Sequence, residues 1–342
     1  MRILITGGTG YVGFHVALAL VRFGHSVKVV ARGISNPDRA RQLADAGVEV
    51  VLADLSESRD LLVKVSPRGI DIIIHGVSSF LEPAGVGSLT VRSMEEAIRF
   101  AMACPSLSLF IDLSNNLPYG DTRTAEWGAG EEFVCRPNTI HGANKLAAEQ
   151  ILRDSGLPCL ILRISQIYGG VGSSFDWIVL DQIRRGKLPL PGNGRNRVDL
   201  VHIDDVCQAV VASVLKRPIG EVINVCSGDT SLTQGELFAF LADCLKVKRP
   251  VKIPYPVALA YAFLAERLAL MRAREIEVVP DMVRVMAMDR VLDTCKAVKL
   301  LGYRPEYPES LAGLEASYAD VFAGQDELFV PAHRLDAVRG NV

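Results

Sequence analysis

Apolar residues follow two kinds of pattern along the first half of this chain. Short runs with few polar residues predict buried strands, and longer stretches with an apolar residue every three or four positions predict amphipathic helices. We expect strands at 3–6, 26–31, 49–52, 71–74, 107–113 and 159–164, and helices between them at 12–23, 37–46, 88–103 and 141–154. Buried strands that alternate with helices are typical of a parallel sheet covered on both faces. Because crossovers are right-handed, this order predicts a doubly wound α/β fold with ligands at the carboxyl ends of the strands.

Glycines follow the first predicted strand directly, where residues 6–13 read T-G-G-T-G-Y-V-G. Gly7 permits a tight turn, Gly10 lets a diphosphate approach the backbone, and Gly13 lets the next helix pack closely on the strand. The free N–H groups and the dipole of that helix favour an anion. In this strand–turn–helix context the motif predicts dinucleotide binding, and the alternative is a glycine-rich turn kept only for packing.

The regular alternation ends after Gln166. Glycine- and proline-rich loops are expected at 169–173 and 188–197, helices at 204–215, 233–245 and 257–272, and a strand at 221–225. We predict a Rossmann domain of residues 1–165, to which 199–226 return. A smaller mixed α/β substrate-binding lobe would comprise 166–198 and 227–325, followed by a tail at 326–342. The apolar stretch 256–265 is too short to span a bilayer and predicts a buried or interfacial helix.

Composition narrows the class of protein. The 342 residues are 49% hydrophobic and 22% charged, as in ordinary globular proteins. The net charge of −2 gives no electrostatic case for nucleic acid, which would need a concentrated basic patch. Met1 leads directly into the first predicted strand, so we expect no targeting peptide. The seven cysteines are scattered and form no C-x-x-C pair, which argues against a zinc site or a disulfide framework. We therefore expect a cytoplasmic protein that binds no metal, nucleic acid or membrane.

Short motifs recur in a fixed order. Besides the glycine motif they are A-D-L at 53–55, I-H-G at 74–76, L-S at 113–114, K-L-A-A-E at 145–149, L-R at 162–163, I-Y-G at 167–169, V-H-I-D-D-V at 201–206, N-V-C-S-G at 224–228 and K-A-V-K-L-L-G-Y-R-P at 296–305. From Met1 to about Ser317 the chain resembles the extended short-chain dehydrogenase/reductases of the NAD-dependent epimerase/dehydratase type. The resemblance implies cofactor contacts from Gly7, Thr9, Gly10, Tyr11, Val12, Gly13, Asp54, Leu55, Gly76 and Lys145. It also implies a homodimer formed through the helices at 88–103 and 141–154.

The chain departs from this family at the catalytic positions. The family carries a Tyr four residues before the Lys, and a Ser or Thr at the end of the fifth strand, where this chain has His141 and Asn115. We predict that His141 transfers a proton or positions a water, that Lys145 contacts the nicotinamide ribose, and that Asn115 polarises the substrate oxygen. The alternatives are that His141 merely begins a helix and that Lys145 forms a surface pair with Glu149.

The end of the second predicted strand bears on the choice of cofactor. NAD-binding members usually carry an acid there, which accepts from the ribose 2′-hydroxyl, but this chain has Ala31 followed by Arg32. The guanidinium of Arg32 can hold a 2′-phosphate in a bidentate manner, with Arg39 or Arg41 as candidates to assist it. We therefore predict NADP as the cofactor, with NAD as the alternative.

Further residues are expected around the substrate. The resemblance suggests contacts from Asn116, Tyr119, Gln166, Tyr168 and Arg197, with the two tyrosines as hydroxyl donors on loops. The predicted function is an NADP(H)-dependent ketoreductase or dehydrogenase acting on a small-molecule carbonyl or alcohol. The alternatives are a sugar-nucleotide epimerase or dehydratase with tightly bound NAD(P), a non-catalytic NADP-binding sensor, and a non-redox cyclase or lyase.

Overall fold

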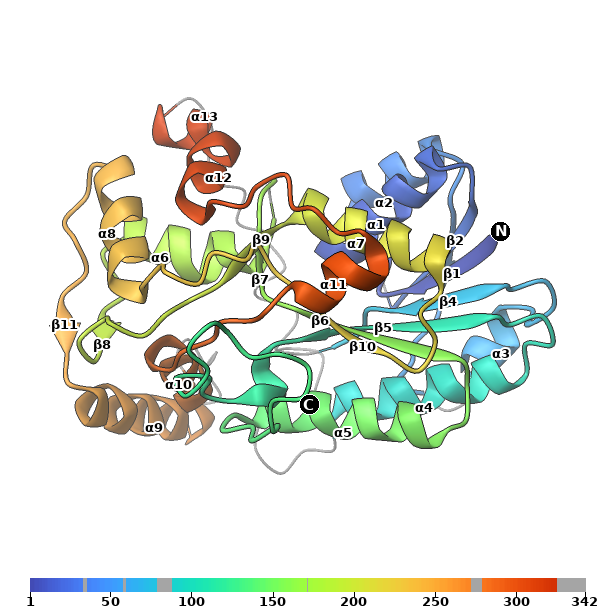
Figure 1. The fold of residues 1–342 in the computed structure, drawn as a ribbon, viewed down its shortest axis with the longest axis horizontal. Coiled ribbons are helices and arrows are strands. Elements are labelled where there is room, and N and C mark those ends of the chain that lie inside the picture. The colour runs from blue at the N-terminus through green and yellow to red at the C-terminus, as the bar shows by residue number, and fades with distance from the viewer. Residues whose placement is uncertain (33–35, 58–59, 79–87, 171, 272–278, 325–342) are drawn as a thin grey trace.

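The computed structural model describes residues 1–32, 36–57, 60–78, 88–170, 172–271 and 279–324. A parallel seven-stranded sheet lies at its centre, in the order β10-β6-β5-β4-β1-β2-β3 (Figure 1). Its strands are β1 (Arg2–Thr6), β2 (Ser26–Ala31), β3 (Glu49–Leu52), β4 (Ile72–His75), β5 (Leu109–Asn115), β6 (Cys159–Ile164) and β10 (Val222–Val225). The chain order reverses at β1, so the prediction of a doubly wound parallel sheet is confirmed.

Helices cover both faces of this sheet. Successive residues of each strand point to opposite sides, and apolar side chains lie on both sides. One face packs against α1 (Tyr11–Arg22), α2 (Pro37–Asp45), α7 (Ile203–Lys216) and α11 (Cys295–Leu301), and the other against α3 (Asp60–Lys64), α4 (Leu89–Met102) and α5 (Ile140–Asp154). In β5, Leu109 and Ile111 join the first layer and Phe110 joins the second. Figure 1 shows α4 and α5 below the sheet and α1 and α7 above it. A homodimer through α4 and α5 stays a prediction.

The fifth strand differs from its prediction at 107–113, because it begins at Leu109 and continues to Asn115. Asp112 and Ser114 are buried within it on the side that faces α5. Polar residues are tolerated there because the helix supplies partners for them, including Lys145 and Glu149. The hydrophobic pattern alone could not extend the strand past Leu113.

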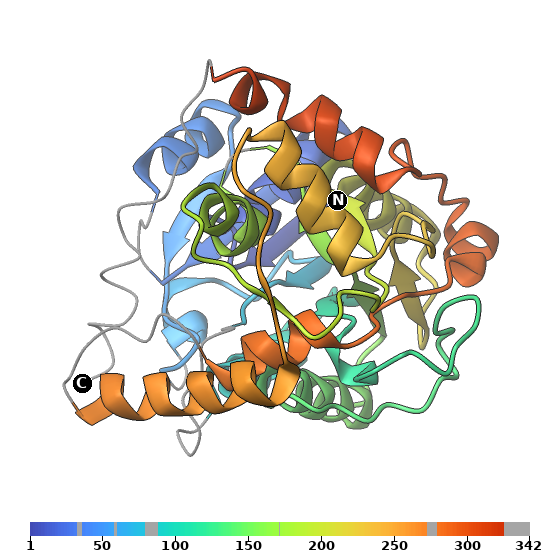
Figure 2. The ribbon, with the colours of Figure 1, turned by 90° about the vertical axis from the view of Figure 1, so that its left-hand side faces the viewer.

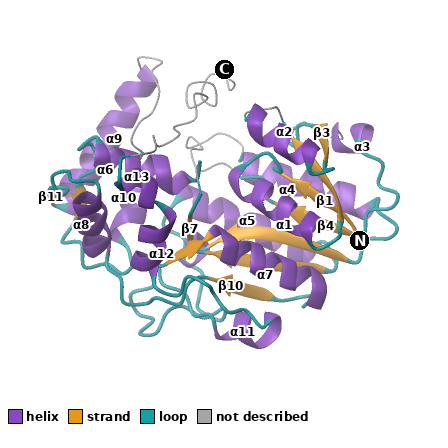
Figure 3. Cartoon of the chain, turned by 90° about the horizontal axis from the view of Figure 1, so that it is seen from above, coloured by secondary structure: helices purple, strands orange, loops and turns teal. Residues whose placement is uncertain are grey.

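The remaining elements form a lobe at the carboxyl ends of the strands (Figure 3). They are β7 (Gln166–Tyr168) paired with β9 (Leu200–His202), β8 (Leu190–Pro191) paired with β11 (Lys252–Ile253), a π-helical turn (Asp176–Leu180), α6 (Asp181–Arg184), α8 (Gln234–Cys244), α9 (Tyr255–Met271), α10 (Pro280–Ala287), α12 (Ser310–Ser317) and α13 (Ala319–Phe322). Phe175, Leu180, Leu237 and Phe238 belong to its separate core. The expected loop at 188–197 contains β8, a short strand that its glycines and prolines concealed. Within the described ranges, no helix is long and apolar enough to cross a membrane.

Candidate active site

The turn between β1 and α1 depends on its glycines. Gly7 has a φ of +72°, and a Cβ atom on Gly13 would lie only 2.4 Å from the carbonyl oxygen of Gly7. Gly10 is the N-cap residue of α1, and no side chain of the described residues caps this end of the helix. The amide groups of the first turn are therefore available to an anion. This narrow, uncapped turn fits the diphosphate of a dinucleotide.

The other predicted cofactor residues surround this turn. Gly76 follows β4 and donates its N–H to the carbonyl of Thr6 at 3.1 Å, which keeps the two strand ends together. Asp54 accepts hydrogen bonds from the backbone and hydroxyl of Ser56, and thus shapes the turn after β3. Leu55 and Thr9 are buried, and Val12 is half-buried. All of these residues except Val12, which lies in the first turn of α1, are at the carboxyl ends of β1, β3 and β4 or in the turns that follow.

Arg32 and Arg39, which the sequence predicts near a 2′-phosphate, lie in different surroundings. Arg32 is exposed directly after β2. The Arg39 guanidinium lies over the rings of Tyr11 and Phe14, with its central carbon 5.5 and 5.6 Å from their centroids. The Tyr11 hydroxyl itself donates to the carbonyl of Gly169. Arg39 thus covers the first turn of α1, whereas Arg32 lies in solvent at the strand end.

His141 and Asn115 form a direct hydrogen bond. Asn115 ends β5, and His141 is a buried residue in the first turn of α5, which Thr139 caps. The Asn115 Oδ1 atom accepts from the backbone N–H of Leu117 at 3.0 Å, so the amide Nδ2 must be the atom that lies 2.9 Å from His141 Nε2. Because Nδ2 is a donor, Nε2 accepts and the imidazole proton lies on Nδ1. The pair therefore places a neutral imidazole at the end of the fifth strand.

Lys145 lies one turn further along α5 and is buried. Its Nζ donates to the carbonyl of Leu113 at 3.0 Å and lies 3.8 Å from Asp112 Oδ1. Burial raises the pKa of Asp112 to about 6, although the Lys145 ammonium acts in the opposite direction. The alternative of a surface pair between Lys145 and Glu149 is wrong, since both residues are buried and Glu149 pairs with Arg163 at 2.6 Å.

These contacts belong to a polar layer beneath α5, at the carboxyl ends of the strands. Its members face the α5 side of the sheet: Thr6, His75, Asp112, Ser114 and Arg163 from the strands, and Lys145 and Glu149 from α5. The Nδ1 atom of His75 lies 2.8 Å from Thr6 Oγ1. Burial and the Lys145 ammonium lower the pKa of His75 to about 3. The sequence signal that was missed is a polar residue near the end of each of four neighbouring strands.

The two predicted substrate tyrosines are not on exposed loops. Tyr119 is buried, donates its hydroxyl to Asn224 Oδ1 at 2.9 Å, and lies under the Arg163 guanidinium at 4.5 Å. Burial raises its pKa to about 12. Tyr168 belongs to β7 and is buried in the core of the lobe. The expectation of two hydroxyls on loops is therefore corrected: each ring packs inside the protein because apolar neighbours surround it.

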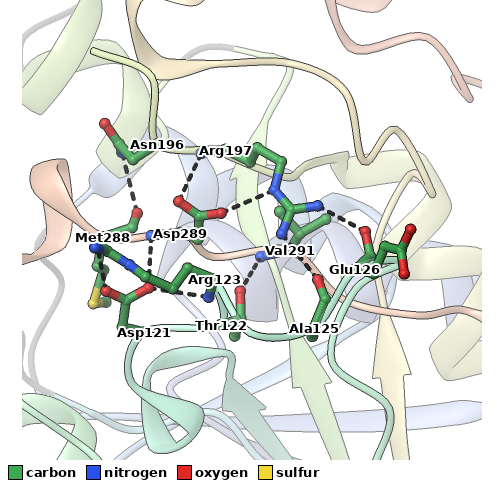
Figure 4. A network of polar contacts seen from close by, with 10 residues as sticks. All are labelled: Asp121, Thr122, Arg123, Ala125, Glu126, Asn196, Arg197, Met288, Asp289 and Val291. Atoms are coloured by element: carbon green, nitrogen blue, oxygen red, sulfur yellow. Dashed lines mark hydrogen bonds and ion pairs between the residues drawn. The ribbon is translucent and has the colours of Figure 1, made fainter. Parts of the chain in front are cut away.

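Arg197, predicted to contact substrate, holds parts of the chain together (Figure 4). Its Nε binds Asp289 Oδ2 at 2.8 Å, and its terminal nitrogens donate to the carbonyls of Ala125 and Glu126 at 2.9 and 2.8 Å. Asp289 in turn donates its backbone N–H to Asp121. Arg197 thereby links the loop around 121–126 to the segment after α10, and its role toward substrate stays a prediction.

Arg290 is a site residue that the sequence did not reveal. It is buried, and its terminal nitrogens donate to the amide oxygens of Gln166 and Gln234 at 3.2 and 3.1 Å. Asn116 donates to the backbone carbonyl of Arg290 at 3.5 Å. Burial lowers the pKa of Arg290 to about 10. A guanidinium held by neutral amides thus lies beside two predicted substrate residues, Asn116 and Gln166.

Comparisons with known proteins show the family of the chain. The model of the NAD dependent epimerase/dehydratase family matches residues 3–226. The chain is 25% identical over 328 residues to the uncharacterized protein y4nL of Sinorhizobium fredii, covering 89% of this chain and 90% of that protein. It is 26% identical over 316 residues to a 4-hydroxy-2-methyl-3-oxo-4-farnesyl-3,4-dihydroquinoline-1-oxide ketoreductase of Stigmatella aurantiaca, covering 89% and 92% of the two chains.

Solved structures share the fold. The dTDP-glucose 4,6-dehydratase DesIV of Streptomyces venezuelae, crystallised as a double mutant with NAD bound, superposes with a TM-score of 0.74 at 22% identity, covering 94% of this chain and 97% of that one. The family match spans well over half of the 342 residues. The chain therefore belongs to the NAD-dependent epimerase/dehydratase family and is an enzyme of the extended short-chain dehydrogenase/reductase type that uses a nicotinamide dinucleotide.

Proposed function

We propose that this enzyme is an NADP(H)-dependent ketoreductase or dehydrogenase acting on a small-molecule carbonyl or alcohol, with His141 in the place of the usual tyrosine. The hydrogen bond between Asn115 and His141 carries the proposal, because it puts a proton-transferring group and an amide donor at one point. When bound, the nicotinamide supplies or accepts hydride. The chain's own residues must then manage the proton on the substrate oxygen.

His141 and Asn115 have different roles toward the substrate oxygen. In alcohol oxidation, the substrate hydroxyl must first replace the Asn115 N–H at the Nε2 lone pair of His141. Nε2 then takes the hydroxyl proton, since the other ring nitrogen already carries one. The Asn115 amide, which then no longer donates to Nε2, donates an N–H to the substrate oxygen. Lys145 is fixed by Leu113 and Asp112 on the β5 side of the site. In carbonyl reduction the same proton moves in the opposite direction.

The test compares His141→Phe with the wild type on a panel of ketones, aldehydes and alcohols. We expect the variant to lose turnover and to bind NADPH with nearly unchanged affinity, measured by fluorescence titration. Gln150→Ala on the exposed side of α5 is the control and should change neither quantity. Wild-type rates in the His141→Phe variant would remove His141 from the mechanism. NADPH binding without turnover by the wild type would favour the sensor, and conversion by nucleotide-free protein would favour the cyclase or lyase.

Arg32 supports NADP as the cofactor, because it is exposed after β2 and no acid precedes it. A charge-assisted hydrogen bond to phosphate contributes about 1.5–3 kcal/mol, so Arg32→Asp should weaken NADPH binding by roughly 10- to 100-fold. The same change should leave NADH affinity unchanged or increase it. A wild-type protein that binds NADH as tightly as NADPH would refute this preference.

A sugar-nucleotide epimerase or dehydratase is the second candidate. The buried Arg290 guanidinium favours it, because its hydrogen-bond partners Gln166 and Gln234 are neutral and could leave its charge to an anionic group of a substrate. The nearby Asp199 carboxyl offsets only part of this charge, since burial raises the pKa of Asp199 to about 7. Such an enzyme would keep its nucleotide through a full catalytic cycle. NAD(P) released when the purified protein is denatured would therefore favour this candidate over the ketoreductase.

A further inference from the structure

Helix α9 (Tyr255–Met271) exposes an unusual number of large apolar side chains. Seven of them are between 39% and 83% exposed: Val257, Tyr261, Phe263, Leu264, Leu268, Leu270 and Met271. Only the small residues Ala258 and Ala262 are buried, in a cluster with Val283 of α10. Contiguous apolar surface of this kind marks a contact with another apolar body.

The exposed face is wide. At about 100° per residue, the seven side chains spread over roughly half of the helix circumference. A seam between two helices would need only the narrow stripe of Val257, Tyr261, Leu264, Leu268 and Met271, which follows the 3–4 spacing of a coiled coil. Phe263, whose ring lies 5.6 Å from the Arg284 guanidinium, and Leu270 lie outside that stripe, and a partner helix would not cover them. The apolar part of a lipid bilayer is wide enough to cover the whole face of α9. A single partner helix would cover only the stripe.

The chain segment before this face is basic, although α9 itself also carries Glu266. The segment that leads into α9 reads K-V-K-R-P-V-K at 246–252, and all four of its basic residues are exposed. Figure 2 faces this end of the molecule and shows the segment with β11 running from α8 to α9, which lies lengthwise along one edge. Arg249 forms an ion pair with Asp243. Arg267 is exposed and, at about 100° per residue, lies within the apolar half of α9 between Phe263 and Leu264, so its long side chain must extend to the headgroups. This concentration of cations stands out in a chain with a net charge of −2.

We propose that α9 docks the protein on the surface of an anionic lipid bilayer. A helix of 17 residues is about 25 Å long, short of the roughly 30 Å hydrocarbon core, so it lies in the plane of the interface. Its apolar half enters the boundary between headgroups and acyl chains, and the basic segment 246–252 contacts anionic headgroups. Asp281 of α10, which packs against α9, accepts the backbone N–H of Ile140 at 2.6 Å. The docked surface thus lies one helix away from the start of α5 and from His141.

Co-sedimentation of the full-length protein with phosphatidylcholine vesicles, with and without phosphatidylglycerol, tests this proposal. We expect binding to the vesicles that contain phosphatidylglycerol, weaker binding to phosphatidylcholine alone, and loss of the difference at high salt. L264Q/L268Q should weaken binding at least tenfold. K248E/K252E should abolish the preference for phosphatidylglycerol. V63Q/I219Q, which changes exposed apolar residues elsewhere, is the matched control and should bind as the wild type does.

The alternative occupant of α9 is a second copy of this chain. Light scattering after size-exclusion chromatography separates the two cases, and NADPH affinity checks that each variant is folded. A wild-type dimer that L264Q/L268Q converts to a monomer, together with no vesicle binding, would overturn the proposal. Vesicle binding that the α9 variants leave unchanged would overturn it as well.

Discussion

The anchoring of α5 to the sheet can be tested at Glu149. Its carboxylate accepts from Arg163 through Nε at 3.2 Å and Nη2 at 2.6 Å, and from the Ser114 hydroxyl at 2.6 Å. The side chains of Glu149 and Arg163 are only 1% and 3% exposed. Glu149→Gln keeps the shape and an acceptor for Ser114, but it leaves the buried guanidinium without a counter-charge. Removing one partner of a buried ion pair costs about 3–5 kcal/mol, so we expect a loss of that size in the free energy of unfolding.

Urea unfolding measures this loss of stability. Two further variants provide the comparison, one at an exposed ion pair and one that removes both buried charges. Glu49→Gln removes a partner from the exposed pair with Lys28, whose N···O distance is 2.8 Å, and should cost at most about 1 kcal/mol. The double variant E149M/R163M removes both buried charges and should recover most of the stability lost in Glu149→Gln. If Glu149→Gln were no more destabilising than Glu49→Gln, the ion pair would not be what holds α5 on the sheet.

Two further predictions concern the glycine turn and the polar layer. Gly13→Ala places a Cβ atom 2.4 Å from the carbonyl oxygen of Gly7 and should abolish NADPH binding in a fluorescence titration, whereas Gly130→Ala, which has open space around it, should bind normally. The pKa of His75 is lowered to about 3 in the folded protein, so its contribution to stability is present above pH 6.5 and is lost as the pH falls toward 3. Between pH 7 and pH 5 this loss amounts to about 2 kcal/mol, and urea unfolding should show it to be absent in His75→Gln. Equal losses in both proteins would mean that His75 does not titrate in this way.

The fold could be predicted because its determinants are local. Each strand is a short apolar run, and the turn at Gly7 to Gly13 joins a strand and a helix that are adjacent in the chain. The structure confirms the doubly wound sheet, and the family comparison confirms the enzyme class. The position of Asn115 opposite His141 follows in the same way, since a strand end and a helix start meet at the carboxyl edge of the sheet.

The rest of the site depends on contacts between distant segments. Arg290 reaches Gln166 across 124 positions, and Tyr119 bonds to Asn224 across 105. A sequence pattern does not tell whether a tyrosine near a loop turns outward or packs beneath a guanidinium, because both give the same local periodicity. The burial of Lys145 was missed for a related reason: its counter-charge, Asp112, lies in a strand that reads as apolar.

The proposed role of His141 as a proton acceptor bears on the presence of Asp112. A tyrosine that gives up its proton becomes an anion, and a neighbouring lysine ammonium stabilises that anion. An imidazole that accepts a proton becomes a cation, and the same ammonium then opposes it. Asp112 lies 3.8 Å from the Lys145 ammonium, and its carboxylate offsets part of that positive charge once it is ionised. Because burial raises the pKa of Asp112 to about 6, this offset is present at neutral pH and fades below it. In the proposed mechanism, the buried carboxylate of Asp112 therefore lowers the electrostatic cost of protonating His141 near Lys145.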